Sequence, residues 1–285
     1  MHSLVLYNDR IVPATERILS PGQIGLLSGW GVFSTLRIYD GVPFAFERHW
    51  RRMEKDAALL HVPLNQHLDP RQVRRLIGEL TRANRAENSV ARLCVVRNQG
   101  GFWEGPGIST AVDLLVLTAD LKSWGESMRL TVARNARHAA SPFAGAKMLS
   151  WANNLTWVEE AQNRGFDEVI LLNERDEVAE CTSANVFAVL EGRVLTPPLA
   201  SGCLPGVTRS VLLEESGGIE ERTLRLEDLY RAEEVFLTST TRELMAVREI
   251  DGRPIAATGG ARARLQEAFS ACVRQYVGEA ERVGA

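Results

Sequence analysis

The chain has 285 residues, of which 45% are hydrophobic, so it can form one large domain or two smaller ones, each with its own core. A net charge of −3 argues against binding to nucleic acid or to a membrane surface. No apolar run approaches the length of a membrane span and no leader pattern is visible, so we expect a soluble, cytoplasmic protein.

The first part of the chain predicts a mixed α+β domain. Asp40-Gly41 is the strongest hairpin signal in the sequence, and Asp69 followed by Pro70 is typical of a capped helix start. The Gly-rich stretch 98–109 is long and turn-forming, which favours an active-site loop over a tight hairpin. In chain order, the expected elements are strands at 4–6, 11–12, 31–39 and 42–46, helices at 47–60 and 70–84, and strands at 90–96 and 111–118.

Residues 121–126 predict an interdomain linker, so we expect a small N-terminal α+β domain over 1–120 and a larger C-terminal domain over 127–285. The predicted strands connect mostly by hairpins, which disfavours a parallel Rossmann-type sheet. In the second domain the expected elements are strands at 128–134, 167–173, 184–190, 192–197 and 233–239, helices at 152–164, from about 206 and at 260–277, and a hairpin around 251–252.

Lysine is rare in this chain: of its 33 basic residues three are lysines, which leaves 33 − 3 = 30 arginines. Lys147 lies in SPFAGAKMLSWANN among small and apolar residues, whereas Lys55 and Lys122 have the charged neighbours of surface positions. An amine can lose its proton and attack a carbonyl, which a guanidinium cannot do at physiological pH. Lys147 is therefore the candidate Schiff-base lysine, and the alternative is a leftover lysine in an arginine-rich sequence.

The four cysteines and five histidines show neither C-x-x-C nor H-x-x-x-H spacing, so we expect reduced thiols and no metal site. A cysteine hydrolase based on Cys181 and His138 is one alternative class of function, but their spacing gives it no support. A non-catalytic phosphate-binding module is another.

Glu180 is expected between a turn and a strand, in a segment dominated by small and apolar residues. A carboxylate in such a place needs a partner. One candidate is the protonated pyridine nitrogen of pyridoxal phosphate, which works as an electron sink while that nitrogen carries a proton. The alternative is a glutamate that caps its own turn or pairs with Arg175.

Three segments have the chemistry of a phosphate site. A predicted helix starts near Gly206, ahead of Val207 and Thr208. The free N–H groups of a helix N-terminus suit a phosphate monoester, although a plain helix cap is the alternative. The hydroxyl cluster 238–241 ends a predicted strand and could add a donor. Arg52 has the shape to hold a phosphate bidentately, but Arg48 and Arg51 on the same helix have it as well.

Together these residues resemble the fold-type IV pyridoxal phosphate enzymes, the class IV aminotransferase family that includes branched-chain aminotransferases, D-amino acid aminotransferases and 4-amino-4-deoxychorismate lyases. The resemblance runs through LVLYNDRIVP, GVFSTLRIYDG, the H-x-x-R-M of His49 to Met53, the Lys147 segment, EVAECTSANVFAV, LPGVTR and FLTSTTREL. It implies a two-domain α+β fold with a small N-terminal α/β sandwich and a larger C-terminal domain whose sheet curls into a pseudo-barrel. It also implies a homodimer.

The resemblance assigns a role to each candidate residue. Lys147 is implied as the Schiff-base lysine, and Glu180 as the partner of the pyridine nitrogen of pyridoxal 5'-phosphate. The implied phosphate ligands are Arg52, Thr208, the backbone N–H of Val207, and Thr240. The reaction implied is a transamination from an amino acid to a 2-oxo acid such as 2-oxoglutarate, in which the freed lysine amine carries a proton.

The expected substrate rests on fewer residues. Arg92 matches a position where branched-chain aminotransferases carry arginine, D-amino acid aminotransferases tyrosine and the lyases lysine. Phe102 stands in the loop where the latter two place a carboxylate-binding arginine. We therefore expect Arg92, Phe33 and Thr241 to contact an L-branched-chain or other hydrophobic amino acid.

Two positions depart from the branched-chain pattern, since Ala152 and Ser28 replace tyrosines of the pocket. Lyase activity, or a preference for D-amino acids or (R)-amines, is therefore the alternative within the family. An apolar pocket could be lined by five aromatic residues, namely Trp30, Phe33, Phe102, Trp103 and Trp124. Core packing is the expected role for at least two of them.

Overall fold

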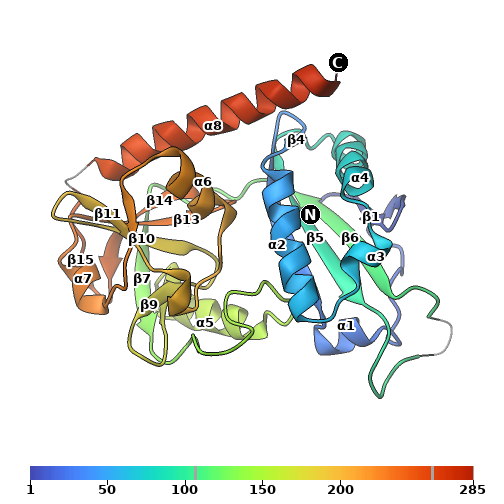
Figure 1. The fold of residues 1–285 in the computed structure, drawn as a ribbon, viewed down its shortest axis with the longest axis horizontal. Helices are drawn as coiled ribbons and strands as arrows, with labels where there is room; N and C mark the ends of the chain where they lie inside the picture. Colours follow the sequence, from blue (N-terminus) through green and yellow to red (C-terminus); the bar gives the residue numbers. More distant parts are fainter. Residues whose placement is uncertain (106–107, 258–259, 285) are drawn as a thin grey trace. The chain divides into compact units, whose positions relative to one another are not determined.

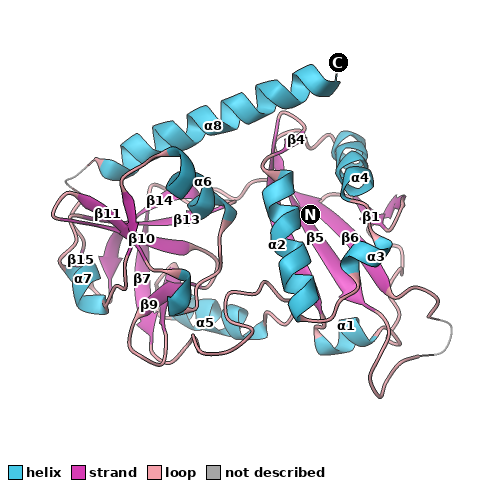
Figure 2. Ribbon diagram, viewed as in Figure 1, coloured by secondary structure: helices cyan, strands magenta, loops and turns pink. Residues whose placement is uncertain are grey.

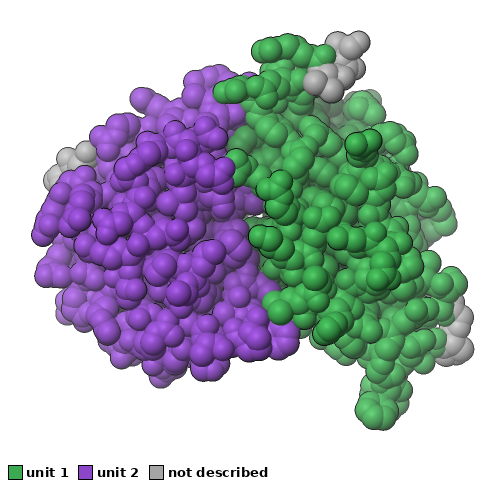
Figure 3. Space-filling model, viewed as in Figure 1, with its two compact units in different colours: residues 1–122, 147–151, 275–285 green, residues 123–146, 152–274 purple. Residues whose placement is uncertain are grey.

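The structure, a computed structural model, describes residues 1–105, 108–257 and 260–284. The chain folds into two compact units, which Figure 3 colours separately. The first contains Met1–Lys122, Lys147–Trp151 and the segment that begins at Gln275, and the second contains Ser123–Ala146 and Ala152–Arg274. The short segment around Lys147 and the end of the last helix therefore belong with the N-terminal part of the chain.

The first unit is built on a six-stranded antiparallel sheet with the strand order β2-β1-β6-β5-β3-β4 (Figure 1). Its elements are β1 (Leu4–Tyr7), β2 (Arg10–Pro13), α1 (Ile24–Ser28), β3 (Gly31–Tyr39), β4 (Val42–Pro43), α2 (Phe46–Leu59), α3 (Leu64–His67), α4 (Pro70–Asn84), β5 (Ser89–Arg97) and β6 (Val112–Ala119). The predicted strands and the two longer helices are confirmed. The strand predicted at 42–46 is shorter, because helix α2 begins at Phe46.

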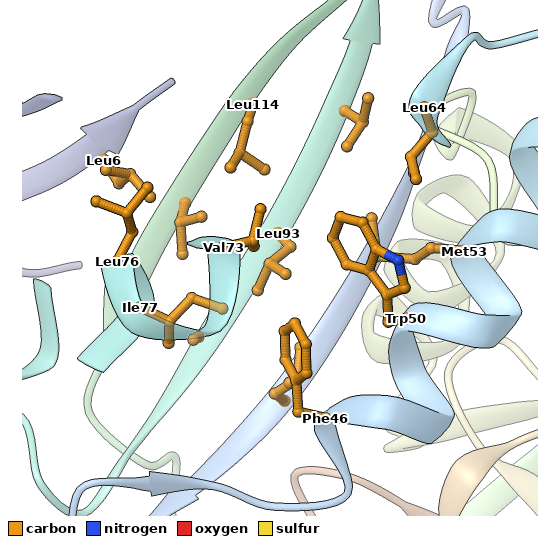
Figure 4. Close-up of a cluster of buried hydrophobic side chains, with 14 of the residues drawn as sticks. Leu6, Phe46, Trp50, Met53, Leu64, Val73, Leu76, Ile77, Leu93 and Leu114 are labelled. Carbon is orange, nitrogen blue, oxygen red and sulfur yellow. The ribbon is translucent and has the colours of Figure 1, made fainter. Parts of the chain in front are cut away.

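Helices α2 and α4 cover one face of this sheet, and Figure 4 shows the apolar side chains between them. On α2, Phe46, Trp50 and Met53 follow the three- and four-residue spacing of one helix face, and all three are buried. Helix α4 begins where the sequence predicts, with the Asp69 side chain accepting the N–H of Arg71. Each such large apolar side chain contributes about 1.5–3 kcal/mol through burial. The packing fixes α2 on the sheet and thereby positions its remaining side chains.

The second unit is built on a nine-stranded sheet with the order β12-β11-β10-β13-β14-β7-β8-β9 and with β15 paired to β14 (Figure 2). Its elements are β7 (Ser127–Ala133), α5 (Ala152–Asn163), β8 (Glu168–Leu172), β9 (Val178–Cys181), β10 (Asn185–Leu190), β11 (Arg193–Thr196), η1 (Leu199–Ser201), α6 (Val207–Glu215), β12 (Ile219–Glu221), α7 (Leu226–Tyr230), β13 (Glu234–Ser239), β14 (Glu243–Ile250), β15 (Arg253–Pro254) and the first part of α8 (Ala261–Gly284). Strand β9 ends the order yet contacts β10, so the sheet curls. The fold is α+β with a curled sheet, as predicted.

Most predicted elements of this unit are confirmed within one or two residues, and the last helix continues past 277 to Gly284. Strand β7 pairs in parallel with β8 and with β14, while most other pairs are antiparallel. The buried core lies between the curled strands and includes large side chains of four of them, namely Met128, Ile170, Val186 and Leu237. Among the described residues, no helix is long and apolar enough to cross a bilayer.

Candidate active site

Lys147 is attached to the sheet of the first unit. Its carbonyl oxygen accepts the N–H of Phe33 at 3.1 Å, and the N–H of Leu149 donates to the carbonyl of Gly31 at 2.9 Å. Val32 and Met148 form an antiparallel bridge between these bonds. The lysine therefore lies beside β3 in a segment joined to that strand by an isolated β-bridge and two main-chain hydrogen bonds, which fix its main chain although it is distant in sequence.

Two aromatic rings lie beside the lysine amine. Nζ of Lys147 is 4.6 Å from the ring centroid of Phe33 and 4.4 Å from that of Trp151. The two rings meet edge to face, with centroids 5.2 Å apart. The guanidinium of Arg92, on β5, lies over Phe33 at 4.1 Å. Three predicted residues, Lys147, Phe33 and Arg92, thus meet around one ring, and Trp151 joins them as a residue that the sequence analysis missed.

Arg52 lies on α2, and its side chain is held by a buried chain of hydrogen bonds. Its Nη2 donates to Oγ of Ser34 at 2.8 Å, and the same oxygen is 2.8 Å from Nδ1 of His49. Because Arg52 can only donate, the Ser34 hydroxyl proton is free to be donated to His49, which fits a neutral imidazole with its own proton on Nε2. Burial, reinforced by the positive charges of Arg52 and Lys147, holds the pKa of His49 well below 6.5.

Asp56 lies one turn beyond Arg52 on α2 and is also buried. Its Oδ2 accepts the main-chain N–H of Lys147 at 3.1 Å. Burial raises the pKa of Asp56 above 3.8, against the lowering effects of that N–H and of the charges of Arg52 and Lys147. The spacing of His49, Arg52 and Asp56, three and four residues apart, puts them on one helix face and is the signal that could have identified this row.

In the second unit, Glu180 lies on β9 with both carboxylate oxygens engaged. Oε1 accepts from Nε of Arg137 at 3.0 Å, and Oε2 accepts the N–H of Leu204 at 3.0 Å. The alternative pairing with Arg175 is wrong, because that arginine binds Glu174 and Glu177. A carboxylate has about four acceptor positions, so Glu180 keeps capacity for a further donor.

The loop that enters α6 is fixed next to Glu180. Nδ2 of Asn185 donates to the carbonyl of Leu204 at 2.9 Å, and a Cβ at position 206 would lie 2.0 Å from Oδ1 of Asn185, so a larger residue there would displace the Asn185 side chain. Within the described residues, the N–H groups of Val207 and Thr208 have no acceptor, as expected for the first turn of a helix. The loop therefore presents two free donors at a helix N-terminus.

Thr240 and Thr241 lie in the turn that follows β13. This turn is held at its second half by contacts with Trp124. The carbonyl of Thr241 accepts from Nε1 of Trp124 at 3.1 Å, and the next side chain, Arg242, stacks over the same indole at 4.0 Å. Arg242 also pairs with the buried Glu168. Strand β13, which this turn follows, pairs with β10, and Asn185 at the start of β10 binds the loop before α6.

The aromatic residues proposed for a pocket divide into two groups. Trp30 and Trp124 pack against the apolar cores of the two units, which confirms core packing for two of them. Phe102 and Trp103 are exposed, by 101% and 76%, in the loop that follows β5. Pro106 and Gly107 of that loop lie outside the described residues.

Comparison with known proteins identifies the family. The model of the family described as amino-transferase class IV matches residues 31–250. The chain belongs to the class IV aminotransferases. It is 31% identical to a putative branched-chain-amino-acid aminotransferase of Methanocaldococcus jannaschii, over 88% of this chain and 89% of that protein. It is 28% identical to a D-alanine aminotransferase of Bacillus licheniformis, over 88% and 89%.

Among solved structures, this class IV aminotransferase resembles the T.th. branched-chain amino acid aminotransferase complexed with N-(5'-phosphopyridoxyl)-L-glutamate. The TM-score is 0.84 at 26% identity, with 98% of this chain and 97% of that chain covered. Class IV aminotransferases use pyridoxal phosphate, so the chain is a pyridoxal phosphate-dependent transaminase related to the branched-chain enzymes.

Proposed function

We propose that the protein transfers the amino group of an L-branched-chain or other hydrophobic L-amino acid to a 2-oxo acid such as 2-oxoglutarate. The arrangement of Lys147, Phe33 and Arg92 carries the proposal. A guanidinium is suited to bind a substrate carboxylate, and the ring beside both cations provides an apolar contact for a side chain. Thr241 is proposed as a further substrate contact.

Each unit offers polar groups that suit pyridoxal phosphate. We assign the phosphate to Arg52, Thr208, the Val207 N–H and Thr240, and the pyridine nitrogen to Glu180. The free first-turn donors of α6 and the glycine at 206 that lets the loop approach Asn185 support the phosphate assignment. When bound, the cofactor supplies an electron sink for the bond that breaks at the substrate α-carbon.

Three side chains of this protein have proposed roles in the reaction. Lys147 would hold the cofactor, and its Nζ would accept the proton that leaves the substrate α-carbon. Arg92 orients the substrate carboxylate. Glu180, held by Arg137 and by the Leu204 N–H, keeps a proton on the pyridine nitrogen.

A D-amino acid donor is the second candidate, because a D-alanine aminotransferase is among the relatives at 28% identity. Both reactions use the same lysine, so the substrate side of the site must decide between them. Phe102 offers no charge for a carboxylate, which favours the L-amino acid.

We also propose that the protein acts as a homodimer in the cytoplasm. Leu26 and Leu27 of α1 are 44% and 60% exposed, and the loop with Phe102 and Trp103 meets the chain just before α1, where the N–H of Gly105 donates to Gly22. Apolar exposure of this kind is typical of an interface with a partner. Sedimentation of the wild type and of Leu27→Glu tests the proposal, and a monomeric wild type would contradict it.

The experiment that tests the function is a spectroscopic scan of the first half-reaction. L-leucine, L-isoleucine and L-valine should convert the bound cofactor to its amine form faster than D-alanine or (R)-1-phenylethylamine. Borohydride reduction and peptide mapping should label Lys147, and a label on Lys55 or Lys122 would contradict the assignment. Conversion by D-alanine alone would select the second candidate, and pyruvate release from aminodeoxychorismate alone would replace both with a lyase.

A further inference from the structure

Asp56 forms the link between α2 and the segment of Lys147. It is only 7% exposed, and its carboxylate accepts the Lys147 N–H at 3.1 Å. The other backbone group of the lysine, its carbonyl, is bonded to β3. The main chain of Lys147 is therefore held from two sides, by a strand and by an acidic side chain.

The charges around this lysine oppose one another. On α2, the charge of Lys147 acts on the neutral His49 and on Asp56, and the charge of Arg52 acts on both of them as well. Lys55 adds a further positive charge near Asp56. On the strand side, the amine lies against Phe33, over which Arg92 is stacked. The two guanidinium groups favour a neutral amine. The Asp56 carboxylate and the faces of the aromatic rings favour a protonated one. Asp56 thus supplies a full negative charge that opposes the effect of the two guanidinium groups.

We propose that Asp56 is a positioning residue for Lys147. The Asp56 carboxylate fixes the lysine main chain, and its negative charge favours the protonated state of the lysine side-chain nitrogen. The inference rests on the proposed function, in which Lys147 carries the cofactor and moves a proton. A lysine that returns a proton to a substrate must be able to hold it. Asp56 supports that state, while Arg52 and Arg92 favour its release.

Two substitutions separate the two effects. Asp56→Asn keeps a carbonyl oxygen that can accept the Lys147 N–H but removes the charge, and Asp56→Ala removes both. Glu54→Gln is the matched control, because it neutralises an acid two residues away whose carboxylate accepts from the indole N–H of Trp50. Thermal unfolding of each loaded protein establishes that it is folded.

The first measurement is a pH titration of the visible absorbance of the loaded full-length protein. Asp56→Asn should lower its pH midpoint by about one unit, because the variant loses the charge interaction between Asp56 and Lys147 and a nearby opposite charge shifts a pKa by that order. Glu54→Gln should leave the midpoint in place. A purely structural role for Asp56 would not move it, so an unchanged midpoint in Asp56→Asn overturns the electrostatic role.

The second measurement is hydrogen exchange at the Lys147 amide, which does not depend on where the cofactor is attached. Asp56→Ala should accelerate exchange by about tenfold, the value of one ordinary hydrogen bond, while Asp56→Asn stays near the wild-type rate. Equal rates in all variants overturn the positioning role. A borohydride label on Lys55 or Lys122 would instead remove the proposed function, and with it the catalytic meaning of Asp56, even if the exchange rates change as expected.

Discussion

Arg242 and Glu168 form a buried ion pair in the second unit, with Nη2 of the arginine 3.2 Å from Oε2 of the glutamate and side-chain exposures of 4% and 0%. Glu168 also accepts from the hydroxyls of Thr182 and Ser183. Arg242 directly follows Thr241, so the pair fixes the turn that we propose to face cofactor and substrate. The carboxylate of a buried residue at the start of β8 thus acts on a loop distant in sequence.

We predict that Glu168→Gln lowers the free energy of unfolding by about 3–5 kcal/mol, because it leaves the charge of Arg242 buried without its anion. Replacing both partners, as in Glu168→Gln with Arg242→Met, should recover much of that loss. Urea denaturation measures both. The exposed pair Arg134 and Asp176, with side-chain exposures of 59% and 58%, is the control. Its removal should cost less than about 1 kcal/mol.

If Glu168→Gln costs no more than the control, water or relaxation compensates the charge of Arg242, and the turn does not depend on the pair. If the single variant is destabilised and the double variant is not rescued, the hydroxyl bonds to Glu168 carry the effect.

A second prediction concerns the buried His49. Its pKa in the folded protein is well below 6.5, so the unfolded chain binds a proton first as the pH falls. Stability is therefore fully present above pH 6.5 and decreases below it, with a slope of up to about 1.4 kcal/mol per pH unit. His49→Asn should abolish this slope in denaturation curves measured at successive pH values. The exposed His67→Asn should keep it.

Asp56 acts in the opposite direction at lower pH. Its folded pKa is raised above 3.8, so its contribution to stability is present at low pH and is lost as the pH rises through that raised value. The slope from His49 should therefore be measured just below pH 6.5. A wild-type curve that stays flat there would mean that His49 is protonated in the folded protein.

Local signals identified the fold better than the site. Helix α4 begins at the predicted position because its cap and proline are adjacent in sequence, whereas the one-turn helices α1 and α3 have too few residues to show a period. The family resemblance supplied the site residues, but not their partners. Asp56 and Lys147 meet because the Lys147 segment forms a β-bridge to β3, and Glu180 meets Arg137 rather than its sequence neighbour Arg175. Such contacts are set by tertiary packing, which sequence spacing does not encode.

A third prediction concerns Glu180, whose carboxylate is bonded to Arg137 and Leu204. Glu180→Gln should retain the cofactor but slow removal of the substrate α-proton by about 10²–10³-fold, because a neutral amide no longer keeps the pyridine nitrogen protonated. Stopped-flow half-reactions with L-leucine measure the rate. Glu177→Gln, on the preceding turn, is the control and should react at the wild-type rate. A wild-type rate in Glu180→Gln would make Glu180 a structural acid.

The last prediction concerns the carboxylate of the substrate and uses Arg92, which lies over Phe33 beside the Lys147 amine. Arg92→Leu should raise KM for L-leucine by about tenfold to a hundredfold, which corresponds to the loss of one charge-assisted hydrogen bond of about 1.5–3 kcal/mol. The slow reaction of an amine that lacks a carboxylate should be unchanged. Steady-state kinetics with both donors measure the difference.

Arg97→Leu is the matched control, because Arg97 ends the same strand and stacks on Trp30 at 3.9 Å, as Arg92 stacks on Phe33. It should leave KM for L-leucine within about twofold of the wild type, since removing a cation–π interaction elsewhere on the strand affects stability and not substrate binding. An equal increase of KM for the amino acid and for the amine in Arg92→Leu would mean that Arg92 only supports Phe33. The substrate carboxylate would then have to be bound elsewhere, and the N–H groups of the Thr240–Thr241 turn would be the next donors to test.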